Sequence, residues 1–177
     1  MSDDAVTLRP AQEKDLDVLD RFMAGPEETG PYQWTGWADP TRWRRRWAEN
    51  GLLGPESGQL MVADGSGDIL GFVAWRKMDA FGGGFYWNVG AQLLPGARGR
   101  GIGTRAQRML VDYLFAHTLA VRIEAVTEEG NIAEQRALEK AGFTREGLMR
   151  SISFRDGRWR DSVRYSVLRD DVPPAGD

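Results

Sequence analysis

The sequence predicts one domain of the mixed α/β class, with strands and helices interleaved around a single sheet. The chain has 177 residues, which is the usual length of one domain. Seven segments have the alternation or apolar content of strands, and four segments have the apolar spacing of helices. A glycine-rich loop at residues 98–104 follows a strand-like run and opens a helix, an arrangement typical of phosphate-binding sites.

The first half of the chain is expected to supply three strands and two helices. Alternation that ends in Pro10 predicts an edge strand, and apolar residues at helical spacing predict a helix directly after it. A loop broken by glycine and proline precedes a short second helix. Two strands follow, joined by the hairpin signal Asp64-Gly65-Ser66-Gly67-Asp68. In chain order, these elements are expected at residues 6–10, 11–23, 41–49, 60–63 and 69–75.

The second half is expected to supply four strands and two helices, the first helix opened by the glycine loop. Asn131 as N-cap and Glu134 three residues later predict a capping box, and Gly142 ends that helix. The last two strands meet at the turn Arg155-Asp156-Gly157. These elements are expected at residues 85–94, 102–114, 121–127, 131–141, 143–154 and 158–168. The domain is thus expected to cover residues 1–170, and residues 171–177 to form a flexible tail.

The composition excludes several classes of protein. The chain is 41% hydrophobic and 28% charged, which is typical of globular proteins, and no apolar run approaches the roughly 18 residues of a membrane span. With no cysteine and one histidine, we expect neither disulfides nor a bound metal. The net charge of −3 gives no indication of nucleic-acid binding. Because the polar N-terminus is no secretory signal, we expect a cytoplasmic protein without nucleic-acid or membrane partners.

The loop Arg98-Gly99-Arg100-Gly101-Ile102-Gly103-Thr104 has the features of a pyrophosphate cradle. Its alternating glycines leave backbone N–H groups open, and the helix N-terminus adds partial positive charge. A nucleotide P-loop is excluded because no Lys-Ser/Thr pair follows. Residues 101–106 also fit a dinucleotide-binding pattern, with Glu124 downstream, although few strand–helix units remain after them. An NAD-dependent oxidoreductase therefore remains a competing interpretation.

Two motifs resemble those of the GNAT-type N-acetyltransferases. Arg98-x-x-Gly101-x-Gly103 resembles the Arg/Gln-x-x-Gly-x-Gly/Ala signature of that family, and residues 131–143 look like its second acyl-CoA motif. The segments Glu146-Gly147, Arg150, 157–161 and 165–168 are similar to the branch that acetylates ribosomal-protein N-termini on alanine or serine. The resemblance implies a mostly antiparallel, splayed sheet of about seven strands, flanked by helices.

The resemblance also implies an acetyl-CoA site where the strand at 85–94 separates from the strand at 121–127. The enzyme would move the acetyl group to a primary amine of a small molecule or a protein N-terminus, by direct attack through a tetrahedral intermediate. Asn131 has two compatible roles, contact with the coenzyme and helix capping. The residues implied for acetyl-CoA are Leu93, Leu94, Arg98, Gly99, Arg100, Gly101, Ile102, Gly103, Thr104 and Asn131.

The chain departs from the family at its catalytic positions. Asn88 stands where many members carry a glutamate base, and Leu138 stands where many carry a tyrosine acid. Glu134 occupies the position of a serine in the branch that this chain resembles, and is either an acid, a proton relay or the capping glutamate. Asn88 and Glu134 are therefore the candidate catalytic residues. We expect catalysis to depend mainly on positioning, so that no single side-chain deletion abolishes it.

The acceptor site is expected to be aromatic, which suits an aromatic, sugar-like or cationic amine. The residues implied for it are Tyr32, Trp34, Trp37, Trp87 and Phe154. A GNAT-fold protein that binds acyl-CoA or a small molecule without turnover remains the alternative, supported by Asn88 and Leu138. The resemblance leaves open a homodimer.

Overall fold

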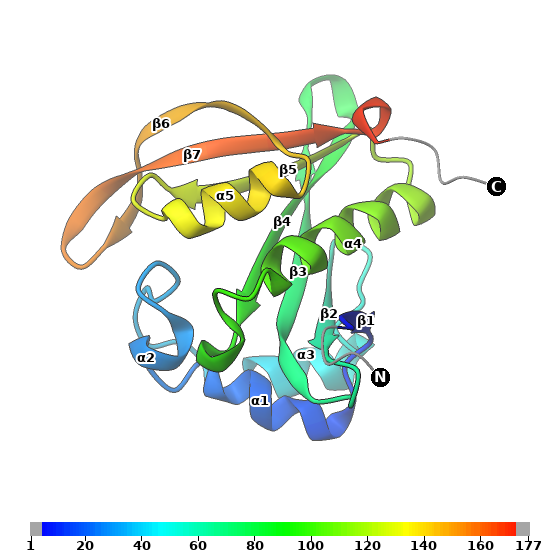
Figure 1. Ribbon diagram of the computed structural model, residues 1–177, viewed down its shortest axis with the longest axis vertical. Helices are drawn as coiled ribbons and strands as arrows, with labels where there is room; N and C mark the ends of the chain where they lie inside the picture. Colours follow the sequence, from blue (N-terminus) through cyan, green and yellow to red (C-terminus); the bar gives the residue numbers. More distant parts are fainter. Residues whose placement is uncertain (1–4, 173–177) are drawn as a thin grey trace.

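The computed structural model describes residues 5–172, which form a seven-stranded sheet with helices on both faces (Figure 1). The strands are β1 Thr7–Arg9, β2 Ser57–Ala63, β3 Ile69–Asp79, β4 Phe85–Leu93, β5 Arg122–Glu128, β6 Thr144–Arg155 and β7 Arg158–Leu168. The helices are α1 Leu16–Arg21, α2 Pro26–Thr29, α3 Arg42–Asn50, α4 Ile102–His117 and α5 Ile132–Lys140. Short 3-10 turns lie at Glu13–Asp15, Phe81–Gly83, Pro95–Ala97 and Arg169–Asp171. No helix in this described range is long and apolar enough to cross a membrane.

The sheet has the strand order β1-β2-β3-β4-β5-β7-β6, and every neighbouring pair is antiparallel except β4 and β5. This confirms the predicted mixed α/β class and the predicted mostly antiparallel sheet. The first strand lies at the edge, as its proline indicated. The last hairpin turns at Asp156 and Gly157, both with positive φ, which matches the predicted turn.

The two faces of the sheet bury two separate apolar clusters. The larger cluster lies between the sheet, α4 and α5, and contains Leu110, Leu114 and Leu138, none of them accessible to solvent. The smaller cluster lies between α1, α3 and the β2–β3 pair, with Trp43 against Phe72 at its centre. Because side chains alternate along a strand, successive residues of β4 face opposite sides of the sheet. The two sides of the sheet therefore offer different surroundings for a ligand.

The central strands separate after a short ladder. β4 and β5 pair only at Trp87–Val89 with Ile123–Ala125, and each then continues without the other (Figure 1). Residues 90–93 consequently have no strand partner on the β5 side. This separation lies where the sequence resemblance implied it.

Some element boundaries differ from those predicted. Residues 11–23 form a 3-10 turn and then α1, because Asp15 is buried and binds Arg9 at 2.6 Å and the backbone N–H of Gln12 at 2.8 Å. The loop after α1 contains α2, which starts at Pro26, where proline suits the first helical position. At the C-terminus, Val172 packs against the larger cluster, and residues 173–177 of the predicted tail lie outside the described range.

Candidate active site

The glycine loop ends in the N-terminus of α4. Gly99 and Gly101 adopt φ of +73° and +74°, in the left-handed region that favours glycine, and Gly101 is the N-cap of α4. A Cβ at either position would meet no atom within 4 Å, so the backbone conformation, and not the available space, requires glycine there. The N–H groups of the first turn, from Ile102 to Thr104, have no partner within the helix and can bind an anion.

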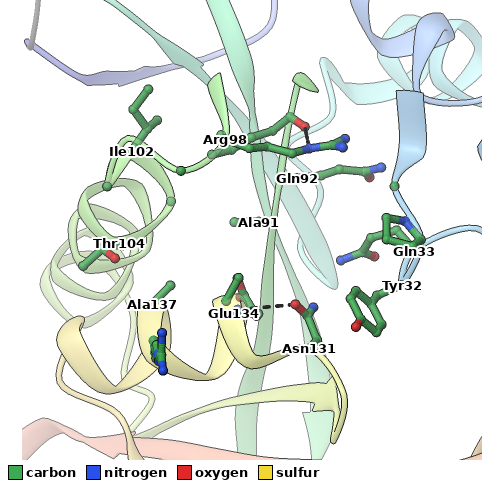
Figure 2. Close-up of a pocket in the computed structure, with 18 of the residues that line it drawn as sticks. Tyr32, Gln33, Ala91, Gln92, Arg98, Ile102, Thr104, Asn131, Glu134 and Ala137 are labelled. Carbon is green, nitrogen blue, oxygen red and sulfur yellow. Dashed lines mark hydrogen bonds between the residues drawn. The ribbon is translucent and has the colours of Figure 1, made fainter. Parts of the chain in front are cut away.

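A cavity of about 580 Å³ opens beside this turn, where β4 and β5 separate (Figure 2). Its walls are the end of β4, the first turn of α4, the cavity-facing side of α5 and the segment 29–33 after α2. The cavity thus joins a helix N-terminus to an unpaired strand edge. The first can bind phosphates, and the second can pair with an extended chain that contains amide groups.

Hydrogen bonds hold the end of α2 and the segment after it in place as a wall of this cavity. Gln92 donates to the carbonyl of Thr29 at 3.2 Å, and the hydroxyl of Tyr32 donates to the carbonyl of Gly130 at 2.8 Å. Arg98 donates to the carbonyls of Leu93 at 2.9 Å and Glu28 at 2.7 Å. Figure 2 shows Arg98 and Gln92 extending toward this segment. The guanidinium of Arg98, expected to bind phosphate, therefore already ties β4 to the α2 segment.

Two basic residues of α5 line the cavity and were not singled out from the sequence. Arg136 and Lys140 are one helical turn apart, so both side chains lie on the α5 face that borders the cavity. The carbonyl of Lys140 accepts a hydrogen bond from Arg108 of α4 at 2.7 Å, which fixes the two helices together. Together with the N-terminus of α4, these cations provide two positively charged walls for an anionic ligand. Their spacing of four residues was the signal available in the sequence.

Asn131 caps α5, but the predicted capping box is only half formed. Its Oδ1 accepts from the N–H of Glu134 at 3.4 Å, and its Nδ2 donates to the Thr127 hydroxyl at 3.0 Å (Figure 2). The return bond is absent in the described structure, because the N–H of Asn131 instead donates to the carbonyl of Glu128 at 2.9 Å. The Glu134 carboxyl group therefore does not accept a hydrogen bond from the N-cap backbone of α5.

The side chain of Glu134 lines the cavity and is half-buried there. Burial raises its pKa to about 7, and the side-chain interaction with the Gln107 amide, which lowers the pKa, is the smaller effect. Glu134 thus exchanges a proton near neutral pH, which is the property required of an acid or base in catalysis.

Several residues predicted for the site lie elsewhere. Trp87 does not line the acceptor site as expected. It is buried in the larger cluster, on the α4 side of the sheet, and its indole N–H donates to the Thr118 hydroxyl at 3.0 Å. Leu94 packs into the other cluster, and the exposed Arg100 lies outside the cavity lining. Asn88 faces a second, smaller cavity on the α3 side of the sheet.

Of the other predicted acceptor residues, only Tyr32 lines the main cavity. Trp34 and Trp37 pack edge to face at 5.0 Å, with Trp37 78% exposed. Phe154 packs against Trp159 near the β6–β7 turn, away from the cavity lining. The structure therefore brings together the glycine loop, Leu93, Asn131, Glu134 and Tyr32, and does not bring these other aromatic residues to them.

Comparison with known proteins gives a family for this arrangement. A family model described as an acetyltransferase (GNAT) domain matches residues 5–144. The probable N-acetyltransferase YjcK of Bacillus subtilis (strain 168) is 39% identical over 83 residues, a match that spans 47% of this chain and 46% of that protein. The putative ribosomal N-acetyltransferase YdaF of the same organism is 28% identical over 148 residues, which cover 84% of this chain and 75% of that protein.

Solved structures share the fold. The spermidine N-acetyltransferase from Vibrio cholerae, whose crystal structure contains CoA and spermine, superposes with a TM-score of 0.77 at 16% identity. The superposition covers 94% of this chain and 96% of that chain. At this level of identity the likeness shows the fold alone.

Proposed function

The chain belongs to the GNAT family of acetyltransferases, whose acetyl donor is acetyl-CoA, and we propose that it transfers the acetyl group directly to a primary amine. The observation that carries this proposal is the main cavity, which joins the α4 N-terminus, the cations of α5 and the free edge of β4. Each of these features suits one part of the donor. The smaller cavity on the α3 side of the sheet, which Asn88 faces, has none of these features.

Different residues of the cavity suit different parts of acetyl-CoA. The first-turn N–H groups of α4 suit the pyrophosphate, and Arg136 and Lys140 add charge for phosphate oxygens. The unpaired edge of β4 at 90–93 offers backbone groups to the amides of the pantetheine arm, as an added strand would use them. Asn131 is oriented by Thr127, which leaves its role in coenzyme contact compatible with its role as a cap.

Glu134 is the acid that we propose for the leaving group. The amine nitrogen attacks the thioester carbon, a tetrahedral intermediate forms, and the carbon–sulfur bond then breaks. Protonated Glu134 gives its proton to the departing thiolate, whose thiol has a pKa of about 8.5, so only modest help is needed. A backbone N–H of the free β4 edge stabilises the charge that builds on the carbonyl oxygen.

The amine loses its proton without a carboxylate at the family's usual position. That position holds Asn88, whose Nδ2 lies 3.5 Å from the carbonyl of Glu124 and which cannot accept the proton. The amine therefore binds in its neutral form, or loses its proton to water. This supports the expectation that positioning accounts for most of the rate enhancement.

The test is a thiol-release assay with acetyl-CoA and a panel of primary amines, with the acetylated product identified by mass spectrometry. We expect release that depends on the amine. A Glu134→Gln variant should lower kcat only about 10-fold, less than the roughly 10²–10⁴-fold that is usual for general acid catalysis, because the thiolate is already a good leaving group. Tight binding of CoA with no acetylated product from any amine would instead support the non-catalytic alternative. A loss of several orders of magnitude in Glu134→Gln, with CoA binding intact, would contradict the role given to positioning.

A further inference from the structure

A second cavity, of about 270 Å³, lies on the face of the sheet that α3 covers. Two rows of residues cross β2, β3 and β4 on this face, and the strand register defines them. The first row is Gln59, Ala74 and Gly90, and the second is Ser57, Arg76 and Asn88. Because Ala74 has only a methyl group and Gly90 has no side chain, the first row leaves a hollow beneath α3. A Cβ at Gly90 would meet nothing within 4 Å.

This cavity contains buried polar groups without partners. Gln59 is 1% exposed, and neither its amide nitrogen nor its amide oxygen has a hydrogen-bond partner in residues 5–172. The indole N–H of Trp43, also buried and lining the cavity, is unpartnered in the same range. Buried polar atoms without partners are costly, and such atoms facing a cavity indicate a ligand that supplies their hydrogen bonds.

The charge of the cavity is positive. Arg46 and Arg76 line it, and none of the described lining residues is acidic. Arg46 donates to the hydroxyl of Ser57 at 2.9 Å, and no carboxylate in residues 5–172 forms an ion pair with either arginine. Burial, with the charge of Arg46, lowers the pKa of the neighbouring Arg42, whose guanidinium lies over the Trp43 ring. The site therefore favours an anion.

The carboxylate that faces this region from β5 is already neutralised. Glu124 pairs in register with Asn88, but it forms ion pairs with Arg122 at 3.0 Å and Arg164 at 3.6 Å. It is also nearly buried, and it does not line the cavity. Its charge therefore compensates arginines of β5 and β7 and leaves those of the cavity unpaired.

Consecutive stretches of β4 line the second cavity and the main one. Residues 88–90 line the second cavity, and residues 91–93 line the main cavity. The boundary between them lies where β4 leaves β5, after Val89. A molecule held in the second cavity would extend along β4 toward the place where the acetyl group is expected.

We propose that the second cavity binds an acidic group of the acceptor, so that the preferred acceptor is an amine that carries a carboxylate or phosphate. This inference rests on the proposed function and narrows its acceptor. It differs from the aromatic, sugar-like or cationic amine expected from the sequence, since Trp34, Trp37 and Phe154 do not line the main cavity. Arg46 and Arg76 bind the acidic group, and the Gln59 amide supplies a further hydrogen bond.

The test compares amines that differ only in the acidic group. L-Glutamate, L-methionine and L-phenylalanine are each compared with the corresponding α-carboxamide. O-phospho-L-serine is added as a phosphate-bearing amine, and spermidine as an amine without an acidic group. Binding to the CoA-saturated protein is measured by calorimetry, and acetylation by thiol release. We expect at least one acid to have a Kd roughly 10-fold or more lower, and a kcat/KM roughly 10-fold or more higher, than its amide. Spermidine should have the lowest kcat/KM.

Variants separate binding from folding. Arg46→Gln and Arg76→Gln should each raise KM for the acidic acceptor roughly 10-fold, and the preference in kcat/KM for the acid over its amide should fall by a similar factor. Gln59→Met, which removes the unpartnered amide, should keep or raise the melting temperature and still raise that KM. The control is Arg45→Gln, on the same helix, because Arg45 pairs with Asp39 at 2.8 Å and does not line the cavity.

The outcomes separate the two proposals. Preference for amides or spermidine, no effect of the arginine variants, or no binding of any acidic probe to the CoA-bound protein would each overturn the acidic-acceptor proposal while leaving acetyl transfer in place. Failure of CoA itself to bind would count against the proposed function. Binding of an acid that depends on Arg46 would still support the second cavity in that case.

Discussion

The raised pKa of Glu134 predicts that the stability of the protein depends on pH. In the folded protein the pKa of this carboxyl group is raised to about 7 because burial disfavours the charged form. The unfolded chain exposes the group to water and restores its ordinary pKa of 4.5. The folded state therefore binds the proton more tightly than the unfolded state. The stability that results is full below about pH 4.5 and is lost as the pH rises through about 7.

The magnitude follows from the two pKa values. The interval from 4.5 to about 7, at about 1.4 kcal/mol for each pH unit, corresponds to about 3 kcal/mol. Glu134→Gln keeps the shape of the side chain and removes the titration. About 1 kcal/mol of this is already lost at pH 5, so the free energy of unfolding of the variant, relative to that of the wild type, should be about 2–3 kcal/mol higher at pH 8 than at pH 5.

The assay is urea unfolding of the ligand-free protein at pH 5 and pH 8. Wild type, Glu134→Gln and the control Glu129→Gln are compared, since Glu129 is exposed just before α5. The control should show the same difference from wild type at both values of pH. If Glu134→Gln also differs from wild type by the same amount at both, the carboxyl group is not buried as described, and its proposed role as an acid loses its basis.

Three further predictions concern the loop, the cations and the core. Gly101→Val forces a branched side chain into φ +74°, so urea unfolding should show a free energy of unfolding lower by about 1–2 kcal/mol. Calorimetry should also show weaker CoA binding. Unchanged CoA binding would contradict pyrophosphate binding by the glycine loop. Arg136→Gln combined with Lys140→Gln should raise KM for acetyl-CoA at least roughly 10-fold, but leave KM for acetyl-pantetheine, which has no phosphate, unchanged. Equal effects on both donors would contradict phosphate binding. Trp87→Ala should cost about 3–5 kcal/mol in urea unfolding, against less than about 0.5 kcal/mol for the exposed Trp37→Ala, and the reverse order would contradict the placement of Trp87.

Features encoded locally were predictable from the sequence. The glycine loop, the α4 periodicity and the Asn131 cap each depend on a few consecutive residues, and each lies where the sequence placed it. The seven strands were also predictable, because alternation and turn residues are local signals. The motif resemblance added the separation of β4 from β5, which alternation alone does not specify.

Features that depend on tertiary packing were not predictable. Alternation shows that Trp87 and Asn88 face opposite sides of the sheet, but not that Trp87 packs into the larger cluster and Asn88 faces a cavity. The sequence predicts that the guanidinium of Arg98 binds phosphate, but its hydrogen bond to the Glu28 carbonyl of α2 depends on tertiary packing. The second cavity depends on Gln59, Ala74 and Gly90 lying in one row, and that row follows only from the strand register.

We propose above that the main cavity binds CoA through the first turn of α4 and the cations of α5. The most direct test is a thermal-shift series with acetyl-CoA, CoA and NADH at matched concentrations, because a ligand that binds only the folded protein raises its melting temperature. We predict a rise with both CoA species, no rise with NADH, and loss of the rise in Gly101→Val. No rise with either CoA species, or a rise with NADH alone, would contradict the account.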